Sequence, residues 1–130
     1  YSNYICQALA LIGMTQDFHE DYLKGRLYIP ADEMKKFNLK ESDIKNLQFT
    51  SDWEVFKKFW LSRIELLLNK GVPLGIKTHG RLRLQVRVMI AAARLLLKRM
   101  EEDRCNLFLS PPRLTKIDWV ILLCRCILIR

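Results

Sequence analysis

Acidic side chains gather in one short segment near the start of the chain, residues 16–21. Asp17 and Asp21 are four residues apart, so a helix would place both carboxylates on one face, with Glu20 beside them. Like charges at this spacing repel each other, and the dipole of a helix disfavours anions in its last turns. Mg²⁺ commonly takes one or two protein carboxylates together with water and substrate phosphates. Such a cation would therefore offset both penalties.

A second interpretation of the same segment is an acidic turn in solvent, neutralised by Lys24 and Arg26. The spacing D-x-x-x-D is common, and by itself it favours this interpretation over a metal site. His19 lies between acidic residues and is more typical of a surface histidine than of a ligand or base. The sequence contains no Ser-His-Asp or Cys-His pattern, no glycine-rich phosphate loop and no zinc spacing.

The apolar pattern predicts which elements position these residues. Residues 4–24 are expected to form one helix that ends at Gly25. Residues 26–30 are expected to be extended, because Pro30 disfavours the helical conformation of the residue before it. Short helices are expected over residues 32–37 and near residues 42–47.

The second half of the chain predicts two long helices and a final shorter one. Ser51 and Glu54 match a capping box that begins a helix reaching about Asn69. The side of this helix that is expected to face the core consists of Val55, Phe56, Phe59, Trp60, Ile64 and Leu67. A loop is expected over residues 71–80 and a long helix over residues 81–103. After the break at residues 111–112, Thr115 is expected to cap a last helix that reaches Ile129. The fold class is therefore all-α.

Basic residues form a stripe on the long helix over residues 81–103. At about 100° per residue, Arg83, Arg87, Arg94 and Lys98 fall within one narrow sector, and the other positions are mostly apolar. The stripe is interpreted either as a solvated face or as a face toward an anionic ligand or membrane.

Charge is distributed unevenly along the chain, whose net charge is +8. Residues 1–50 hold six basic and seven acidic side chains, whereas residues 51–130 hold sixteen and seven. A basic half is compatible with nucleic acid, an anionic membrane or a phosphorylated ligand. No nucleic-acid recognition motif is present, and the acidic segment argues against that partner, so we expect no nucleic-acid binding.

The length of 130 residues fits one domain, and the 50% apolar content excludes disorder. No apolar run is long enough to span a bilayer. The four cysteines form no metal or redox motif and read as reduced thiols. The expected location is therefore the cytoplasm, with peripheral contact with an anionic membrane as an alternative. No signal peptide is recognised before the first helix. Tyr1 is not an initiator Met, which suggests that the chain is a fragment of a longer protein.

Residues 17–30, D-F-H-E-D-Y-L-K-G-R-L-Y-I-P, resemble the second aspartate-rich motif of the squalene/phytoene synthase family, D-x-x-E-D…G-R-x-Y-[LI]-P. Residues 8–11, A-L-A-L, are similar to the A-L-Q-L of that family. Later segments resemble the hydroxysqualene synthases of bacterial hopanoid pathways, including G-V-P-L and G-R-L-R-L within residues 68–84 and D-W at residues 118–119. Gln16 also fits that branch.

The resemblance implies an isoprenoid-synthase helical fold, of which residues 1–130 would be the C-terminal portion of a single domain. It implies a Mg²⁺-dependent enzyme that removes diphosphate from presqualene or another prenyl diphosphate. Carried over by motif, Asp17 and Asp21 would hold Mg²⁺, with Glu20 supporting them. The resemblance also gives Asp17, Asp21 and Tyr28 catalytic roles, and places Arg26 and Gln16 at the diphosphate.

The sequence departs from the family pattern at several positions. The family usually has Asn and Gln where this chain has Gly13 and Ala10, and Tyr where it has Cys105. An arginine cluster that follows in the family is replaced by residues 109–111, L-S-P. The first aspartate-rich motif of the family is absent from these 130 residues. We therefore expect activity only in a full-length chain that includes the missing N-terminal half, and an inactive segment in isolation.

These departures leave a second function open. The chain would then be a divergent, non-catalytic relative that keeps the helical fold and binds a partner or a membrane surface. Product, exact substrate and oligomeric state are not determined by the sequence, because the residues of the pocket are divided between the two halves.

Overall fold

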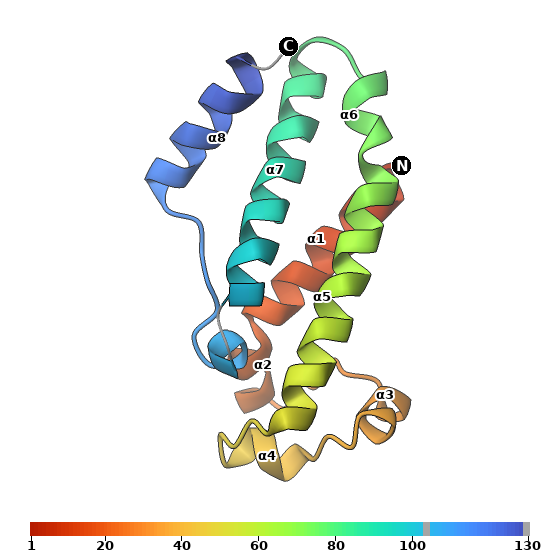
Figure 1. Ribbon diagram of the computed structural model, residues 1–130, viewed down its shortest axis with the longest axis vertical. Coiled ribbons are helices and arrows are strands. Elements are labelled where there is room, and N and C mark those ends of the chain that lie inside the picture. The colour runs from red at the N-terminus through yellow and green to blue at the C-terminus, as the bar shows by residue number, and fades with distance from the viewer. Residues whose placement is uncertain (103–104, 129–130) are drawn as a thin grey trace.

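The computed structural model describes residues 1–102 and 105–128, which form helices joined by short turns (Figure 1). In chain order the helices are α1 (Ser2–Gln16), α2 (Phe18–Leu23), α3 (Ala31–Lys36), α4 (Glu41–Lys45), α5 (Ser51–Gly71), α6 (Pro73–Lys77), α7 (Gly80–Glu102), the 3₁₀ turn η1 (Cys105–Phe108) and α8 (Lys116–Leu128). No strand occurs in these two ranges, so the expected all-α class is confirmed.

The three long helices α1, α5 and α7 build the core. Helix α1 packs against α5, and α7 packs against both. The side chains between them are apolar and almost fully buried, and they include Ala8, Ile64, Leu68, Ala93 and Met100. Figure 1 shows α7 between α5 and α8, with α2, α3 and α4 together at the lower end of the bundle.

Glycine allows α5 and α1 to approach closely where they cross. A Cβ atom on Gly71 would lie 2.4 Å from the Cγ1 atom of Ile5, which is too close for a real contact. The last residue of α5 must therefore be small. The expected loop over residues 71–80 is partly wrong, because Pro73 begins the short helix α6 immediately afterwards. Proline suits a first helical turn, since its missing N–H would have no partner there.

The single helix expected over residues 4–24 is divided at Asp17. Helix α1 ends at Gln16 and α2 begins at Phe18, with Asp17 at φ −95° and ψ 5° between them. The reason lies in Phe18, which is the buried side chain of α2 and packs edge-on against the ring of Phe108, with centroids 4.8 Å apart. Burial of this ring is favoured over straight continuation of the helix.

Three successive short helices end in the same way. After α2, α3 and α4, the residues Gly25, Asn38 and Leu47 have φ values of +77°, +54° and +55°. The N–H groups that follow donate back to carbonyls five residues earlier, from Arg26 to Asp21, Leu39 to Met34 and Gln48 to Asp43. These are Schellman caps, in which a left-handed residue satisfies the last helical carbonyls. The predicted stop at Gly25 is confirmed.

The two predicted N-terminal caps have opposite outcomes. Helix α5 begins at Ser51 but has Thr50 as its N-cap and no side-chain cap hydrogen bond, so the capping box at Ser51 is wrong. At α8 the Thr115 hydroxyl accepts the N–H of Asp118 (3.2 Å), and the Thr115 N–H donates to the Asp118 carboxylate (2.7 Å). This reciprocal pair is a true capping box.

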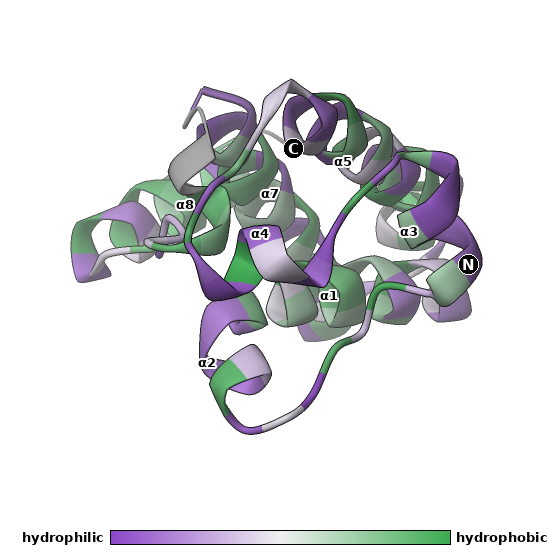
Figure 2. Cartoon of the chain, turned by 90° about the horizontal axis from the view of Figure 1, so that it is seen from below, coloured by the Kyte–Doolittle hydropathy of each residue, from purple (hydrophilic) through white to green (hydrophobic). Residues whose placement is uncertain are grey.

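The remaining predictions for the long helices are largely confirmed. Phe56, Trp60 and Ile64 of α5 are buried as expected, whereas Val55 is 57% exposed. The expected ends at residues 103 and 129 lie outside the described residues. Helix α8 packs along α7, and Figure 2 shows it on the side of α7 that faces away from α3.

Candidate diphosphate-binding site

The last turn of α1 is fixed to α5 by a buried hydrogen bond. The indole N–H of Trp60 donates to the hydroxyl of Thr15 (2.9 Å), and this hydroxyl donates to the carbonyl of Leu11 (2.7 Å). Thr15 is only 3% exposed. On the other side of Asp17, Phe18 is held in the aromatic core. Asp17 therefore lies at a fixed position between two buried neighbours, with its own side chain 54% exposed.

A segment far along the chain lies beside Asp17. The side-chain amide of Gln16 donates to the carbonyl of Pro112 (2.9 Å), and the guanidinium of Arg113 lies 4.0 Å from the Asp17 carboxylate. Sequence reasoning missed Arg113. It is the first cation after the break at residues 111–112, two residues beyond residues 109–111, where the resemblance places an arginine cluster. An arginine this close to the expected cluster was the available signal.

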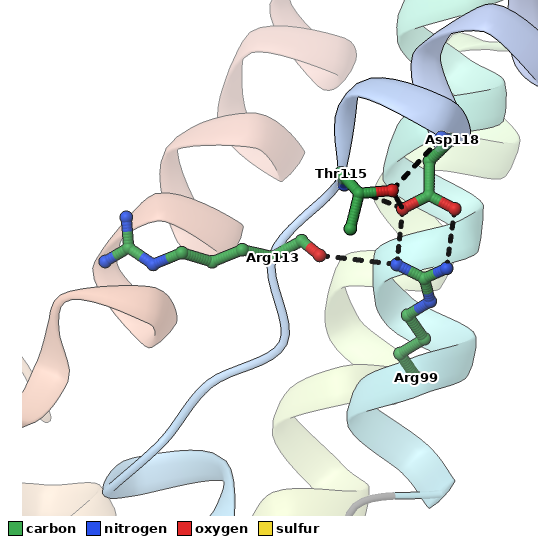
Figure 3. Close-up of polar contacts among 4 residues, drawn as sticks. All are labelled: Arg99, Arg113, Thr115 and Asp118. Carbon is green, nitrogen blue, oxygen red and sulfur yellow. Dashed lines mark hydrogen bonds and ion pairs between the residues drawn. The ribbon is translucent and has the colours of Figure 1, made fainter.

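The segment that carries Arg113 is itself fixed by α7 and α8. Figure 3 shows Arg99 of α7 forming two hydrogen bonds with the carboxylate of Asp118, at 2.7 and 2.9 Å, and a third with the carbonyl of Arg113 at 3.3 Å. The hydrogen bonds from Arg99, and then those from Thr115, hold the pKa of Asp118 well below its ordinary value. In the same view the Arg113 side chain points away from this pair.

The three carboxylates of the motif have different surroundings. Glu20 accepts a hydrogen bond from Lys24 at 2.8 Å, and this contact lowers the pKa of Glu20 and raises that of Lys24. Asp21 is half-buried, and its carboxylate makes no hydrogen bond or ion pair within the described part of the chain. Asp17 faces Arg113. The interpretation as a neutralised acidic turn thus fits Glu20 and Lys24, whereas Arg26 forms no ion pair among the residues described.

The division at Asp17 changes the electrostatics expected for this motif. The sequence placed the carboxylates in the last turns of one helix, where the dipole opposes them. In the structure Glu20 and Asp21 lie in the first turn of α2, where the exposed N–H groups favour anions. The spacing of four is nevertheless kept, because the N–H of Asp21 donates to the carbonyl of Asp17 at 2.8 Å.

The other two predicted residues lie just after the motif. The N–H of Arg26 donates to the carbonyl of Asp21 (2.8 Å), and its side chain is exposed. Tyr28 is 39% exposed and, with Met14, lines a small apolar cavity of about 10 Å³ under the end of α1. His19 is half-buried, and its Nδ1 atom has no partner in the described residues, so the expected surface histidine is only partly correct.

Comparison with known proteins identifies the family. The squalene/phytoene synthase family model matches residues 1–119. The chain is 36% identical to a 15-cis-phytoene synthase of Synechococcus elongatus over 41% of its own length and 17% of the relative's. It is 26% identical to a phytoene synthase of Arthrospira platensis over 75% of its length and 32% of the relative's. No solved structure matches the chain.

The chain belongs to the squalene/phytoene synthase family. Its all-α architecture agrees with the helical fold of isoprenoid synthases. The match to a third relative, the chloroplastic phytoene synthase 2 of Zea mays, covers 47% of this chain and 15% of that protein. The chain thus spans less than a third of the length of each of these relatives.

The positions where this member departs from the family pattern lie on an open face of α1. Ala10 is exposed and Gly13 half-buried, and a Cβ atom on Gly13 would meet nothing within 4 Å. Both lie on the side of α1 that continues to Asp17. The side chain of Cys105 lies outside the described residues. Within the described ranges, no group of three or more His, Cys, Asp or Glu side chains is arranged to hold a metal ion.

Proposed function

We propose that this chain is the part of a prenyl-diphosphate enzyme that binds the diphosphate group through Asp17, Asp21 and Arg113. The observation that supports this function most directly is the position of the family's acidic motif beside a cation from a distant segment. Asp17 and the guanidinium of Arg113 lie 4.0 Å apart, and both are largely exposed. A carboxylate and a guanidinium side by side fit a metal-bound diphosphate, since the metal needs an anion and the phosphate oxygens need donors.

The donor set fits Mg²⁺ only when a second oxygen source is present. Two carboxylates, those of Asp17 and Asp21, remain available on one turn of helix, while Glu20 is engaged by Lys24. Mg²⁺ usually keeps several waters and is bound by one or two carboxylates plus phosphate. Two aspartates therefore suit an ion shared with the substrate. When bound, Mg²⁺ would neutralise charge on the diphosphate leaving group.

The remaining residues of the site act by position. Arg113 provides a delocalised cation that forms bidentate contacts with phosphate oxygens. Gln16 holds the backbone beside Arg113 through the carbonyl of Pro112, which favours a positioning role for Gln16 in addition to the proposed contact with diphosphate. Arg26 and Tyr28 follow the motif in the sequence, and their proposed roles, at the diphosphate and in catalysis, come from the family resemblance.

The finer assignment within the family follows the sequence resemblance. We propose a hydroxysqualene-type reaction of hopanoid biosynthesis, in which presqualene diphosphate loses diphosphate and water adds to the resulting cation. The relatives named above are phytoene synthases, whose reaction also belongs to isoprenoid biosynthesis. The match of Gln16 and of residues 68–84 to the hydroxysqualene branch supports this choice. The alternative is a non-catalytic relative, which would release no diphosphate in the experiment below.

The test measures Mg²⁺-dependent release of diphosphate from presqualene diphosphate by the full-length protein. Asp17→Asn combined with Asp21→Asn is expected to lower the rate at least about a hundredfold, because both anionic oxygen ligands become neutral. The matched control removes two exposed carboxylates elsewhere, by Glu65→Gln with Glu101→Gln, and should leave the rate unchanged. Equal rates in the two double variants would contradict the proposed metal role.

Binding is measured separately from turnover. Calorimetry with inorganic diphosphate and Mg²⁺ should show weaker binding for Arg113→Gln by on the order of tenfold, the loss of a charge-assisted contact. The control is Arg81→Gln, an exposed arginine at the start of α7. Diphosphate binding without turnover of presqualene diphosphate would support the site and refute the hydroxysqualene assignment.

A further inference from the structure

The segment that carries Arg113 has no helical hydrogen bonds of its own. Residues 111–115 join η1 to α8 without regular secondary structure. Pro111 and Pro112 have a restricted backbone, and each disfavours the helical conformation of the residue before it. Both also lack an N–H group. The position of the segment therefore depends mainly on hydrogen bonds that its carbonyls accept from other elements.

Two successive carbonyls of this segment accept hydrogen bonds from two different helices. The carbonyl of Pro112 accepts the side-chain amide of Gln16 at the end of α1 (2.9 Å). The carbonyl of Arg113 accepts Nη1 of Arg99 in α7 (3.3 Å). Gln16 directly precedes Asp17, so the backbone around Arg113 is held from the acidic motif on one side and from α7 on the other.

The guanidinium of Arg99 is itself held in one direction. The carboxylate of Asp118, whose side chain is 12% exposed, accepts both of its terminal nitrogens, and it also accepts the hydroxyl and the N–H of Thr115. A guanidinium is a planar fork with fixed donor directions. Because Nη1 donates to both Asp118 and the carbonyl of Arg113, the carboxylate sets the direction in which Arg99 meets the segment.

The side chain of Arg113 extends from this anchored backbone to the acidic motif. Figure 3 shows its carbonyl directed toward Arg99 and its guanidinium pointing away. The guanidinium lies 4.0 Å from the carboxylate of Asp17. Lys24 is the main cause of the lowered pKa of Glu20, and the charge of Arg113 adds to this effect. The side chain of Arg113 is 71% exposed, and a fixed backbone lowers the entropy that is lost when such a side chain is ordered on a ligand.

We propose that Arg99 and Asp118 are positioning residues of the diphosphate site, because they hold Arg113 where its guanidinium can meet a diphosphate bound at the acidic motif. The inference rests on the proposed function, in which Arg113 contacts the diphosphate. Neither residue of the pair contacts the diphosphate itself. Since Asp118 also forms the capping box at the start of α8, the attachment of α8 and the affinity for diphosphate are coupled.

The experiment measures binding of inorganic diphosphate with Mg²⁺ to the full-length protein by calorimetry. Arg99→Gln removes the fork and is expected to weaken binding about threefold to tenfold, the range of coupling within one hydrogen-bond network. Arg99→Lys keeps the charge without the fork and should recover only part of the affinity. The matched control is Arg94→Gln, which removes an exposed arginine of α7 that donates to Asn69 (3.1 Å), and it should leave the affinity unchanged.

A double-mutant cycle separates positioning from a general loss of structure. In Arg113→Gln the positioned guanidinium is absent, so adding Arg99→Gln should change the affinity by less than about twofold. Asp118→Asn should weaken binding in the wild-type background, because the fork loses its anionic partner, and should have no further effect in Arg113→Gln. A pair that only stabilises the fold would lower the affinity equally in both backgrounds.

Reciprocal coupling provides a second measurement. Because Arg113 would join the bound diphosphate to the segment before α8, saturating diphosphate with Mg²⁺ should slow amide hydrogen exchange in the first turn of α8. The slowing should be absent in Arg113→Gln saturated with the same ligand. Unchanged exchange in the wild-type protein would overturn the positioning role.

The outcomes of the binding cycle distinguish this inference from the proposed function. Wild-type affinity in Arg99→Gln, together with weaker binding in Arg113→Gln, would refute the positioning role and leave the proposed function intact. Equal losses from Arg99→Gln in the two backgrounds would also refute it, since the pair would then support the fold alone. Unchanged binding in Arg113→Gln would remove the proposed contact of Arg113 with diphosphate, and the positioning role with it.

Discussion

At the scale of single residues, Asp17 depends on its two buried neighbours. The Thr15 hydroxyl accepts a hydrogen bond from the indole N–H of Trp60 in α5, and Phe18 packs among aromatic rings of the core. The aspartate between them has little freedom in its backbone, although its carboxylate is in solvent. A fixed backbone with an accessible carboxylate is the arrangement that a ligand-binding side chain needs.

The hydrogen bond between Thr15 and Trp60 makes a measurable contribution to stability. In Thr15→Val the shape is kept but the buried indole N–H loses its acceptor, so the free energy of unfolding should fall by about 1–3 kcal/mol. Thr15→Ser keeps the hydroxyl and is the control, with a smaller loss from one methyl group. Urea denaturation measures both. Equal stability of the Val and Ser variants would show that the hydroxyl is not needed as an acceptor.

Residue types and spacing were enough to locate the cluster of acidic residues and to predict that a helix stops at Gly25. They did not predict Arg113, because its contact with Asp17 joins residues almost a hundred positions apart and no local pattern encodes it. The pairing of Glu20 with Lys24 was the alternative interpretation of the same residues, and it follows from a helical spacing of four.

At the scale of elements, packing decides where the helices begin and end. The capping pattern S-x-x-E at residues 51–54 is present without forming its hydrogen bonds, whereas T-x-x-D at residues 115–118 forms them and gains Arg99 as well. The sequence motif was similar in the two places, and at the second one Arg99 of α7 bonds the same carboxylate that caps the helix. Local patterns therefore predicted the helices better than their boundaries.

The crossing of α1 and α5 should tolerate no side chain at Gly71. Gly71→Ala would place a methyl group against Ile5, so the free energy of unfolding is expected to fall by about 1–3 kcal/mol. Gly13→Ala is the matched control in α1, where the added methyl group meets nothing and helix propensity favours alanine by about 1 kcal/mol. Thermal and urea unfolding should move in opposite directions for the two variants. A stabilising effect of alanine at both positions would contradict the close crossing.

At the scale of the whole molecule, the helices are not equally well secured. Helices α1, α5 and α7 share one buried core, whereas α8 contributes only Leu122 as a buried side chain among its described residues. The first turn of α8 is held by Asp118, through Arg99 and Thr115. The attachment of α8 is therefore mainly polar, and we expect it to be the first to fail.

None of the described helices combines the length and the apolar character that crossing a bilayer requires.

Acid should detach α8 before the rest of the bundle. The pKa of Asp118 is lower in the folded chain than its ordinary value, so its contribution to stability is complete above that value and is lost as the pH falls through the folded pKa. In NMR spectra recorded from neutral pH downward, the indole signal of Trp119 should change before those of Trp53 and Trp60. Asp118→Asn should remove most of this acid dependence. Simultaneous change of all three signals in the wild-type chain would contradict the expected order.

The three consecutive Schellman caps have a consequence for the time course of folding. They close α2, α3 and α4 with hydrogen bonds between residues only five apart. Contacts this local need little chain diffusion, and loops of about ten residues close within about 10–100 ns. The turns that follow the acidic motif can thus form before the long helices have packed together. The slow steps that remain are the packing of α1 against α5 and the contact of Arg113 with Asp17.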